Sequence, residues 1–250
     1  MTKLDEAKLS TVAELLKSAR SAAVLTGAGV SKESGIPTFR EAQSGLWANY
    51  DPQTLATPEG FLKDPKLVWQ WYDHRRRTVQ TVQPNPGHYA IAQLQKIMPL
   101  TVITQNVDGL HERAGAKGVI ELHGSILRFV CFDRRHVVPD VPEGLENPPK
   151  CHCGSLVRPA VVWFGEMLPL DAMKQASAAV EGADVVLVVG TSGLVQPAAS
   201  LPFMARSAGA TLVEINPDIT PISDSVDFFL QGQSGIVLPA LMNLIQEKSK

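Results

Sequence analysis

The sequence predicts an α/β fold in which helices cover both faces of an open parallel sheet and a smaller domain is inserted. Short apolar runs with the length of buried strands recur along the chain, which opens and closes with segments of helical spacing. Two long segments break this pattern. A chain of 250 residues with 44% hydrophobic residues is long and apolar enough to bury the core of such a fold.

The expected elements follow one another from the N-terminus. Apolar residues at helical spacing predict an opening amphipathic helix around Leu9–Leu16, and the run at 22–26 predicts the first strand. The remaining elements are four buried parallel strands and a closing amphipathic helix, at 100–104, 184–189, 211–215, 226–230 and 238–247.

The small domain is expected from the two segments that break the pattern, 41–87 and 125–164. The first segment indicates a helix around 67–78, and the second has many prolines and all three cysteines. The sheet domain then consists of 1–40, 88–124 and 165–250.

Composition narrows the class of function. A formal net charge of −2 argues against a nucleic-acid partner bound through a broad basic surface. The polar, acidic start of the chain resembles neither a signal nor a transit peptide, so we expect a cytoplasmic protein without a membrane partner. Three cysteines are too few for a disulfide framework, which leaves a metal site or inert thiols.

A glycine turn, Gly27-Ala28-Gly29, directly follows the first expected strand. Such glycines let backbone amides approach a pyrophosphate, although a simple chain reversal is the alternative. Hydride-transferring Rossmann enzymes need a third glycine, where this chain has Lys32, and an acidic residue about twenty positions later. A conventional dehydrogenase is therefore disfavoured.

Polar residues follow three of the other expected strands. They are Gln105-Asn106-Val107-Asp108, Gly190-Thr191-Ser192 and Asn216-Pro217-Asp218. Ligands of open parallel sheets bind outside the carboxyl ends of the strands. We therefore expect one shared site here, the alternative being three ordinary loop starts.

These motifs, in this order, resemble the sirtuins, the NAD-dependent protein lysine deacylases. The resemblance covers nearly the whole chain and includes Gly35–Arg40, Leu122-His123-Gly124 and Val162–Glu166. It implies a Rossmann-like NAD-binding domain and a small domain with a helical and a zinc-ribbon-like module. The bacterial and archaeal members of class III, which remove succinyl, malonyl or glutaryl groups, are the expected subgroup.

The resemblance also implies the chemistry. The acyl-lysine carbonyl oxygen attacks the nicotinamide riboside and expels nicotinamide, and His123 then acts as the base. A neutral imidazole with a pKa of about 6.5 suits this step. The products are nicotinamide and O-acyl-ADP-ribose. The alternatives are a mono-ADP-ribosyltransferase and a non-catalytic NAD-sensing protein.

NAD is the expected co-substrate. Phe39 would shield the reacting sugar, Arg40 would lie near the phosphates, and Asn106 with Asp108 would hold the carboxamide end. The full set of residues implied to bind NAD is Gly27, Ala28, Gly29, Phe39, Arg40, Gln105, Asn106, Val107, Asp108, Gly190, Thr191, Ser192, Asn216, Pro217, Asp218 and Ser234.

The expected partners are proteins or peptides that carry acyl-lysine. Backbone of Val162, Phe164, Gly165 and Glu166 would pair with the substrate as an added strand. Tyr72 and Arg75, three apart on a helix, match the class III pair that binds an acyl carboxylate, and Ala56 would enlarge the pocket. A solvated helix face is the alternative for Arg75–Arg77. Acetyl-lysine is smaller and should also fit.

The metal site departs from the pattern of the family, which usually holds a structural zinc between two cysteine pairs. Cys131, Cys151 and Cys153 are the expected ligands, but Arg134 stands where the fourth cysteine would be. His136, His152 and Asp133 are candidates for the fourth ligand, and a degenerate site without metal is the alternative.

Overall fold

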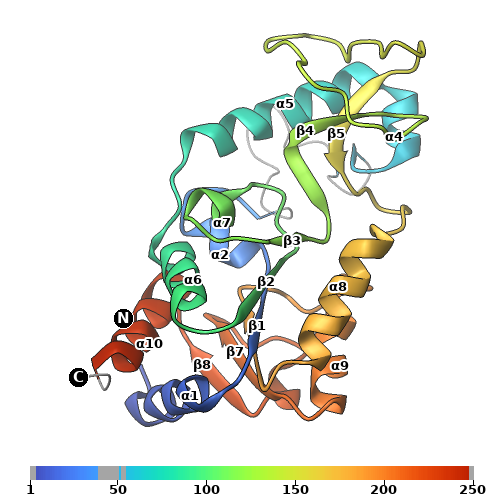
Figure 1. Ribbon diagram of the computed structural model, residues 1–250. Helices are drawn as coiled ribbons and strands as arrows, with labels where there is room; N and C mark the ends of the chain where they lie inside the picture. The colour runs from blue at the N-terminus through green and yellow to red at the C-terminus, as the bar shows by residue number, and fades with distance from the viewer. Residues whose placement is uncertain (1–3, 39–50, 52–54, 248–250) are drawn as a thin grey trace.

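The computed structural model describes residues 4–38, 51 and 55–247. Its main sheet has six parallel strands in the order β3-β2-β1-β6-β7-β8 (Figure 1). The order reverses at β1 and β6, which creates the crevice where ligands bind in such sheets. The expected parallel sheet is confirmed. The strands are β1 (Ala22–Thr26), β2 (Leu100–Thr104), β3 (Ile120–Glu121), β6 (Val185–Val189), β7 (Thr211–Asn216) and β8 (Phe228–Gln231).

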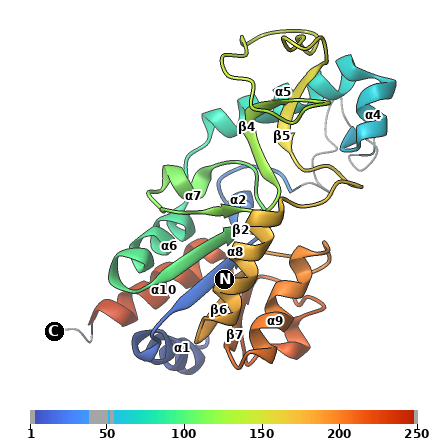
Figure 2. The same cartoon turned by 45° about the vertical axis from the view of Figure 1, so that its right-hand side comes forward.

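Helices cover both faces of this sheet, as Figure 2 shows. Successive strand side chains point to opposite faces, so Val24 packs in one hydrophobic cluster and Leu25 in the other. On the first face lie α1 (Glu6–Ser18), α6 (Pro86–Ile97) and α10 (Ser234–Glu247), and on the second lie α8 (Leu170–Glu181) and α9 (Leu201–Ser207). Both faces are buried, which explains why the strands read as continuous apolar runs.

Within the part of the chain that the structure describes, four short helical segments connect the strands of this domain. Among the described residues, α2 follows β1 and α7 follows β2, so both begin at the carboxyl edge of the sheet (Figure 1). The bounds are α2 (Ala28–Lys32), α7 (Leu110–Arg113) and the 3₁₀ turns η2 (Ala198–Ser200) and η3 (Ser223–Ser225).

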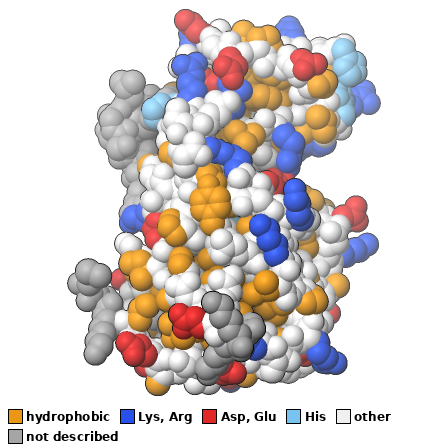
Figure 3. All heavy atoms as spheres, turned by 60° about the vertical axis from the view of Figure 1, so that its left-hand side comes forward, with side chains coloured by type: hydrophobic (Ala, Val, Ile, Leu, Met, Phe, Trp, Pro, Cys, Tyr) orange, Lys and Arg blue, Asp and Glu red, His pale blue; other side chains and the backbone are white. Residues whose placement is uncertain are grey.

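The small domain lies beyond the carboxyl ends of β1 and β2 (Figure 1). It combines α4 (Pro58–Lys63) and α5 (Pro65–Thr81) with the antiparallel strands β4 (Gly124–Cys131) and β5 (Val157–Val161). Its own core contains Phe61, Trp71, Tyr72, Ile126 and Trp163. The surface in Figure 3 is indented between the two parts of the molecule, and basic side chains lie beside the indentation.

Several element boundaries differ from the expected ones. β6 begins at Val185, one residue later than expected, and the carboxylate of the preceding Asp184 accepts from the Arg20 amide at 2.7 Å and from its guanidinium. β8 begins two residues later than expected, since the Asp227 carboxylate accepts from the amide of Leu212 at 2.8 Å. α10 begins before its interior Pro239, at Ser234.

The pair β4 and β5 was not expected. A register shift between Ser125 and Phe129 and mixed exposure along β4 hide the alternation that marks a strand. None of the helices within the described residues has the length and apolar character that crossing a membrane requires.

Candidate active site

Three glycines bring the loops after β1 and β6 into direct contact. The Gly29 amide donates to the Gly190 carbonyl at 2.8 Å, and the Gly27 amide donates to Val189 at 3.0 Å. A Cβ atom on Gly29 would lie 2.7 Å from the Gly190 oxygen, and one on Gly27 would lie 2.8 Å from Thr191. No larger residue fits these positions without moving a backbone, so the glycines shape the crevice between β1 and β6.

Asn106 joins the loop after β2 to the loop after β1. Its side-chain amide donates to the Gly27 carbonyl and to the Ser31 hydroxyl, both at 3.0 Å. Its backbone amide donates to the hydroxyl of Thr104 at 3.0 Å. Asn106 is buried, and these bonds fix its side chain at the crevice that we expect NAD to enter.

Asp108 lies in the same loop and is buried. Burial raises the pKa of this carboxyl, and hydrogen bonds from the Leu110 amide and from Ser31 oppose the rise. Val107, between Asp108 and Asn106, is half-buried and packs against the core of the small domain. This loop therefore contacts both domains.

His123 lies between β3 and β4, and its ring is held by one defined hydrogen bond. Nδ1 is 2.9 Å from the carbonyl oxygen of Gln105. Because a carbonyl only accepts, the proton of the neutral ring is on Nδ1, and Nε2 keeps its lone pair. Burial lowers the pKa of His123, and the bond to Gln105 opposes this shift. The ring is therefore a neutral base at pH 7.

Gly124 fixes the backbone beside His123. It has a φ of 73°, and a Cβ atom there would lie 2.0 Å from the Ala160 oxygen of β5. The His123 carbonyl accepts from the amide of Val162 at 2.9 Å. Strand pairing of the small domain thus places the histidine.

Thr191 links three of the strand ends. Gln105 donates to its hydroxyl at 3.0 Å, and Asn216 donates to its carbonyl at 2.9 Å. The loops after β2, β6 and β7 therefore form one connected edge. Exposed residues at this edge are Ala28, Ser192, Pro217 and Asp218.

Ser234 begins α10, and its hydroxyl donates to the carboxylate of Glu33. The same carboxylate accepts from the Gly235 amide at 3.0 Å. Glu33 thus stabilises the start of this helix. Phe39 and Arg40, two of the residues expected to bind NAD, lie outside the described residues.

A buried polar network below these loops was missed by sequence reasoning. His111 Nε2 is 2.9 Å from the Thr26 hydroxyl, and His88 Nε2 is 3.5 Å from the Ser31 hydroxyl. The two imidazole rings are 4.9 Å apart. The dipeptide Asn85-Pro86 is a sequence signal for a helix start, and it could have predicted the start of α6, which carries His88. Asn85 indeed caps α6 by accepting from the Gly87 amide at 2.9 Å.

The three arginines of α5 lie in different environments. The exposed Arg77 and the buried Arg76 both donate to Asp73. Arg75 is half-buried and lies 4.9 Å from the ring centre of Trp71. Burial lowers the pKa of Arg75, and Tyr72 partly offsets this effect.

Tyr72 is buried in the core of the small domain. Its hydroxyl accepts from Trp163 Nε1 at 2.9 Å, which leaves its own proton to be donated. Burial raises the pKa of Tyr72 to about 12, so the phenol is neutral. Ala56 belongs to the same hydrophobic cluster.

The segment Val162–Glu166 connects β5 to the sheet domain. The Phe164 amide donates to the Ala56 carbonyl at 2.9 Å, and the Phe164 side chain is exposed. Gly165 is exposed and has a φ of 84°. Glu166 turns inward and binds the buried Arg158 at 2.6 and 3.0 Å. This segment is therefore anchored on both sides.

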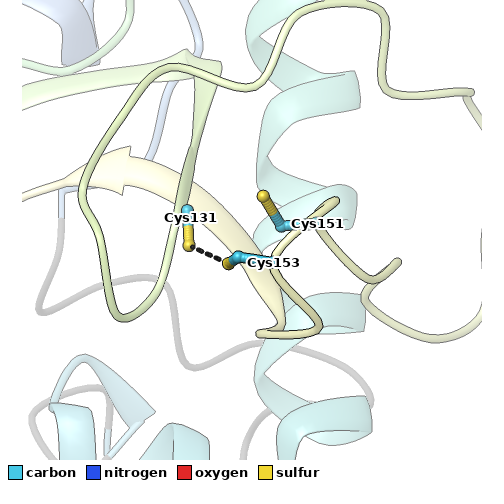
Figure 4. A group of neighbouring side chains, drawn as sticks. All are labelled: Cys131, Cys151 and Cys153. Atoms are coloured by element: carbon cyan, nitrogen blue, oxygen red, sulfur yellow. Dashed lines mark hydrogen bonds between the residues drawn. The ribbon is translucent and has the colours of Figure 1, made fainter.

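The three cysteines lie together at the far end of the small domain. Their sulfur atoms are within 4.8 Å of one another, and His136 and His152 form a second such group with Cys151. Figure 4 shows Cys131 at the end of β4 opposite the two others, which come from the loop before β5. Thiolate and imidazole are the donors that zinc prefers, so the cluster fits this metal.

Comparisons with known proteins agree with this arrangement. Residues 27–197 match the model of the Sir2 family. An NAD-dependent protein deacylase 2 of Pyrobaculum aerophilum is 51% identical over 95% of this chain and 96% of the relative. An NAD-dependent protein deacylase 1 of Archaeoglobus fulgidus is 48% identical over 98% of this chain and 99% of the relative.

Solved structures give the same result. A Sir2 homologue in complex with NAD has a TM-score of 0.91 and 46% identity, and the match covers 96% of this chain and 94% of that one. A Sir2 protein bound to a myristoylated histone peptide has a TM-score of 0.79 and 34% identity over 98% of both chains. With matches of this extent, the chain belongs to the Sir2 family.

Proposed function

We propose that this protein is an NAD-dependent protein lysine deacylase. The observation that carries the proposal is the orientation of His123, whose Nδ1 is fixed on the Gln105 carbonyl so that Nε2 remains a base. His123 lies at the connected strand edge where NAD would bind. Relatives named NAD-dependent protein deacylases and a neighbour that holds NAD support the assignment.

Each residue of the edge has a role that follows from its position. Gly27, Gly29 and Gly190 hold the loops after β1 and β6 together beside the place where the pyrophosphate would bind, and Asn106 with Asp108 holds the nicotinamide end. His123 removes the proton of a ribose hydroxyl, and the freed oxygen attacks the acyl carbon of the imidate that joins the substrate to ADP-ribose. Uptake of one water and departure of the lysine amine then leave the acyl group on ADP-ribose. Burial serves this step, because a neutral imidazole accepts a proton without first losing one.

Substitution of His123 tests the function. His123→Ala should keep NAD affinity and fold but lower deacylation by about 10²- to 10⁴-fold, the usual contribution of a general base. Mass spectrometry of an acyl-lysine peptide with and without NAD measures the product. Loss of the acyl mass with formation of O-acyl-ADP-ribose supports deacylation, whereas a gain in peptide mass indicates ADP-ribosylation. His74→Ala, an exposed histidine of α5, is the control; wild-type turnover in His123→Ala contradicts the proposal.

The substrates that we propose are acyl-lysine peptides with succinyl, malonyl, glutaryl or acetyl groups. A neutral Tyr72 hydroxyl and the Arg75 guanidinium, one helical turn apart, can both donate to an acyl carboxylate. The anchored segment Val162–Glu166 would pair with the extended peptide, so flanking side chains matter less than the acyl group.

Arg75→Met tests whether Arg75 sets the preference for acidic acyl groups without being needed for deacetylation. Charge-assisted hydrogen bonds contribute about 1.5 to 3 kcal/mol, so desuccinylation should fall about ten- to hundredfold more than deacetylation. The ratio of kcat/KM on matched succinyl and acetyl peptides measures this difference. Arg77→Met, whose side chain is 61% exposed in the wild type, should leave the ratio unchanged. Equal losses on both peptides would refute the pairing with the acyl carboxylate.

A further inference from the structure

The cysteine cluster of the small domain needs one more ligand to form a closed zinc site, which takes four protein ligands. Zinc–sulfur bonds of about 2.3 Å in a tetrahedron separate two sulfurs by about 3.8 Å. The sulfur atoms of Cys131 and Cys153 are 3.5 Å apart, close to this spacing, and the sulfur of Cys151 lies within 4.8 Å of both.

A tight turn after Cys131 brings His136 alongside it. The Cys131 amide donates to the His136 carbonyl, and the Arg135 amide donates to the Cys131 carbonyl, both at 3.0 Å. Arg135 has a φ of 58°, the left-handed region that such turns use. Arg134 lies inside the turn, where its amide donates to the Cys131 sulfur at 3.4 Å. Because of this turn, His136 can take the place beside Cys131 that a cysteine at position 134 would occupy.

The distance from His136 to the cluster fits a shared metal. Its Nε2 atom is 3.1 Å from the sulfur of Cys151. Zinc–nitrogen bonds of about 2.0 Å and zinc–sulfur bonds of about 2.3 Å place such atoms about 3.5 Å apart. His136 groups with Cys151 but not with all three cysteines, so its ring must turn toward the two other sulfurs to complete the tetrahedron.

The two other candidates from the sequence fit less well. His152 Nδ1 is 3.5 Å from the Cys151 sulfur, but its side chain is exposed, and its ring stacks on His136 with centroids 4.9 Å apart. His152 therefore packs against the ring of His136. Asp133 is exposed and belongs to neither group of clustered donors among the described residues.

We infer that His136 is the fourth ligand of a Cys₃His zinc site formed with Cys131, Cys151 and Cys153. The inference is independent of the proposed deacylase activity. Four protein ligands leave no position for water, so the metal would hold the turn after β4 against the loop before β5 and take no part in catalysis.

Cobalt(II) added to the metal-free protein tests the ligand set, because thiolate-to-cobalt absorption rises with the number of bound thiolates. His136→Cys should absorb about one third more strongly than the wild type, since four thiolates replace three. His136→Ala should bind zinc about a hundredfold more weakly, because it lacks one of the four ligands that together supply the binding free energy. His152→Ala is the matched control and should bind like the wild type.

A rescue variant guards against simple misfolding. In the His136→Ala protein, Arg134→Cys supplies a thiol to the turn and should restore one zinc per chain, measured by elemental analysis. Equal absorption of wild type and His136→Cys, wild-type zinc affinity of His136→Ala, or a wild-type protein that binds neither metal would overturn the inference.

Discussion

Arg158 is a fully buried cation at the centre of the small domain. Its guanidinium lies 3.3 Å from the ring centre of Trp163 and binds the carboxylate of Glu166 at 2.6 Å. Burial lowers the pKa of Arg158, and Glu166 opposes that shift. Glu166 also accepts from the Trp163 amide at 2.9 Å. One carboxylate therefore both neutralises a buried charge and fixes the segment expected to bind the peptide.

Removal of Glu166 should be costly for this reason. Glu166→Ala leaves Arg158 buried without its counter-charge, and we expect a loss of about 3 to 5 kcal/mol in the free energy of unfolding. Urea denaturation of the purified protein measures the change. Glu146→Ala breaks the exposed pair with Lys66 and should cost at most about 1 kcal/mol. Similar losses in the two variants would contradict this view of the pair.

At the scale of elements, α6 and α7 meet through two buried histidines below the candidate active site. Burial lowers the pKa of His88 to about 3 and that of His111 to about 4, with a further decrease at His88 from its neighbour. In an unfolded chain a histidine binds a proton once the pH falls below about 6.5. In the folded protein both rings stay neutral until the pH falls to about 4 or lower. Acid therefore favours the unfolded chain.

His111→Gln should reduce the dependence of stability on pH. As the pH falls from about 6 to about 4.5, each such histidine lowers the free energy of unfolding by about 1.4 kcal/mol per pH unit. Replacing one of the two histidines should remove its contribution to this slope. Urea denaturation across this range measures the difference in slope between variant and wild type. Titrating groups other than His88, whose pKa His111 influences, contribute equally to both proteins and cancel. His74→Ala, at an exposed position, should keep the wild-type slope. An unchanged slope in His111→Gln would show that His111 does not titrate as described.

At the scale of the whole molecule, the site is assembled from loops distant in the sequence. Gly27, Gln105 and Thr191 follow three different strands, and parallel pairing at β1 places their loops at one edge. His123 is oriented by Gln105 and by the pairing of β4 with β5. Neither domain alone provides this geometry.

Much of this arrangement could be predicted from the sequence. The apolar runs identified β1, β2, β6 and β7 closely, because a strand buried on both faces has no polar positions. Polar residues after the strands marked the shared edge, since carboxyl ends of parallel strands meet there. The pair β4 and β5 was missed, because its bulge and its half-exposed surface give no regular alternation.

The sequence by itself determined the family motifs and the parallel sheet, and it supplied the residues that we propose carry the chemistry. Only the tertiary structure decided which tautomer His123 adopts, that Glu166 neutralises Arg158, and that His136 lies closer than His152 to the Cys151 sulfur. The physical reason is that residue types and their spacing fix local backbone and donor chemistry. Burial, hydrogen-bond partners and pKa arise from segments that meet only when the chain folds.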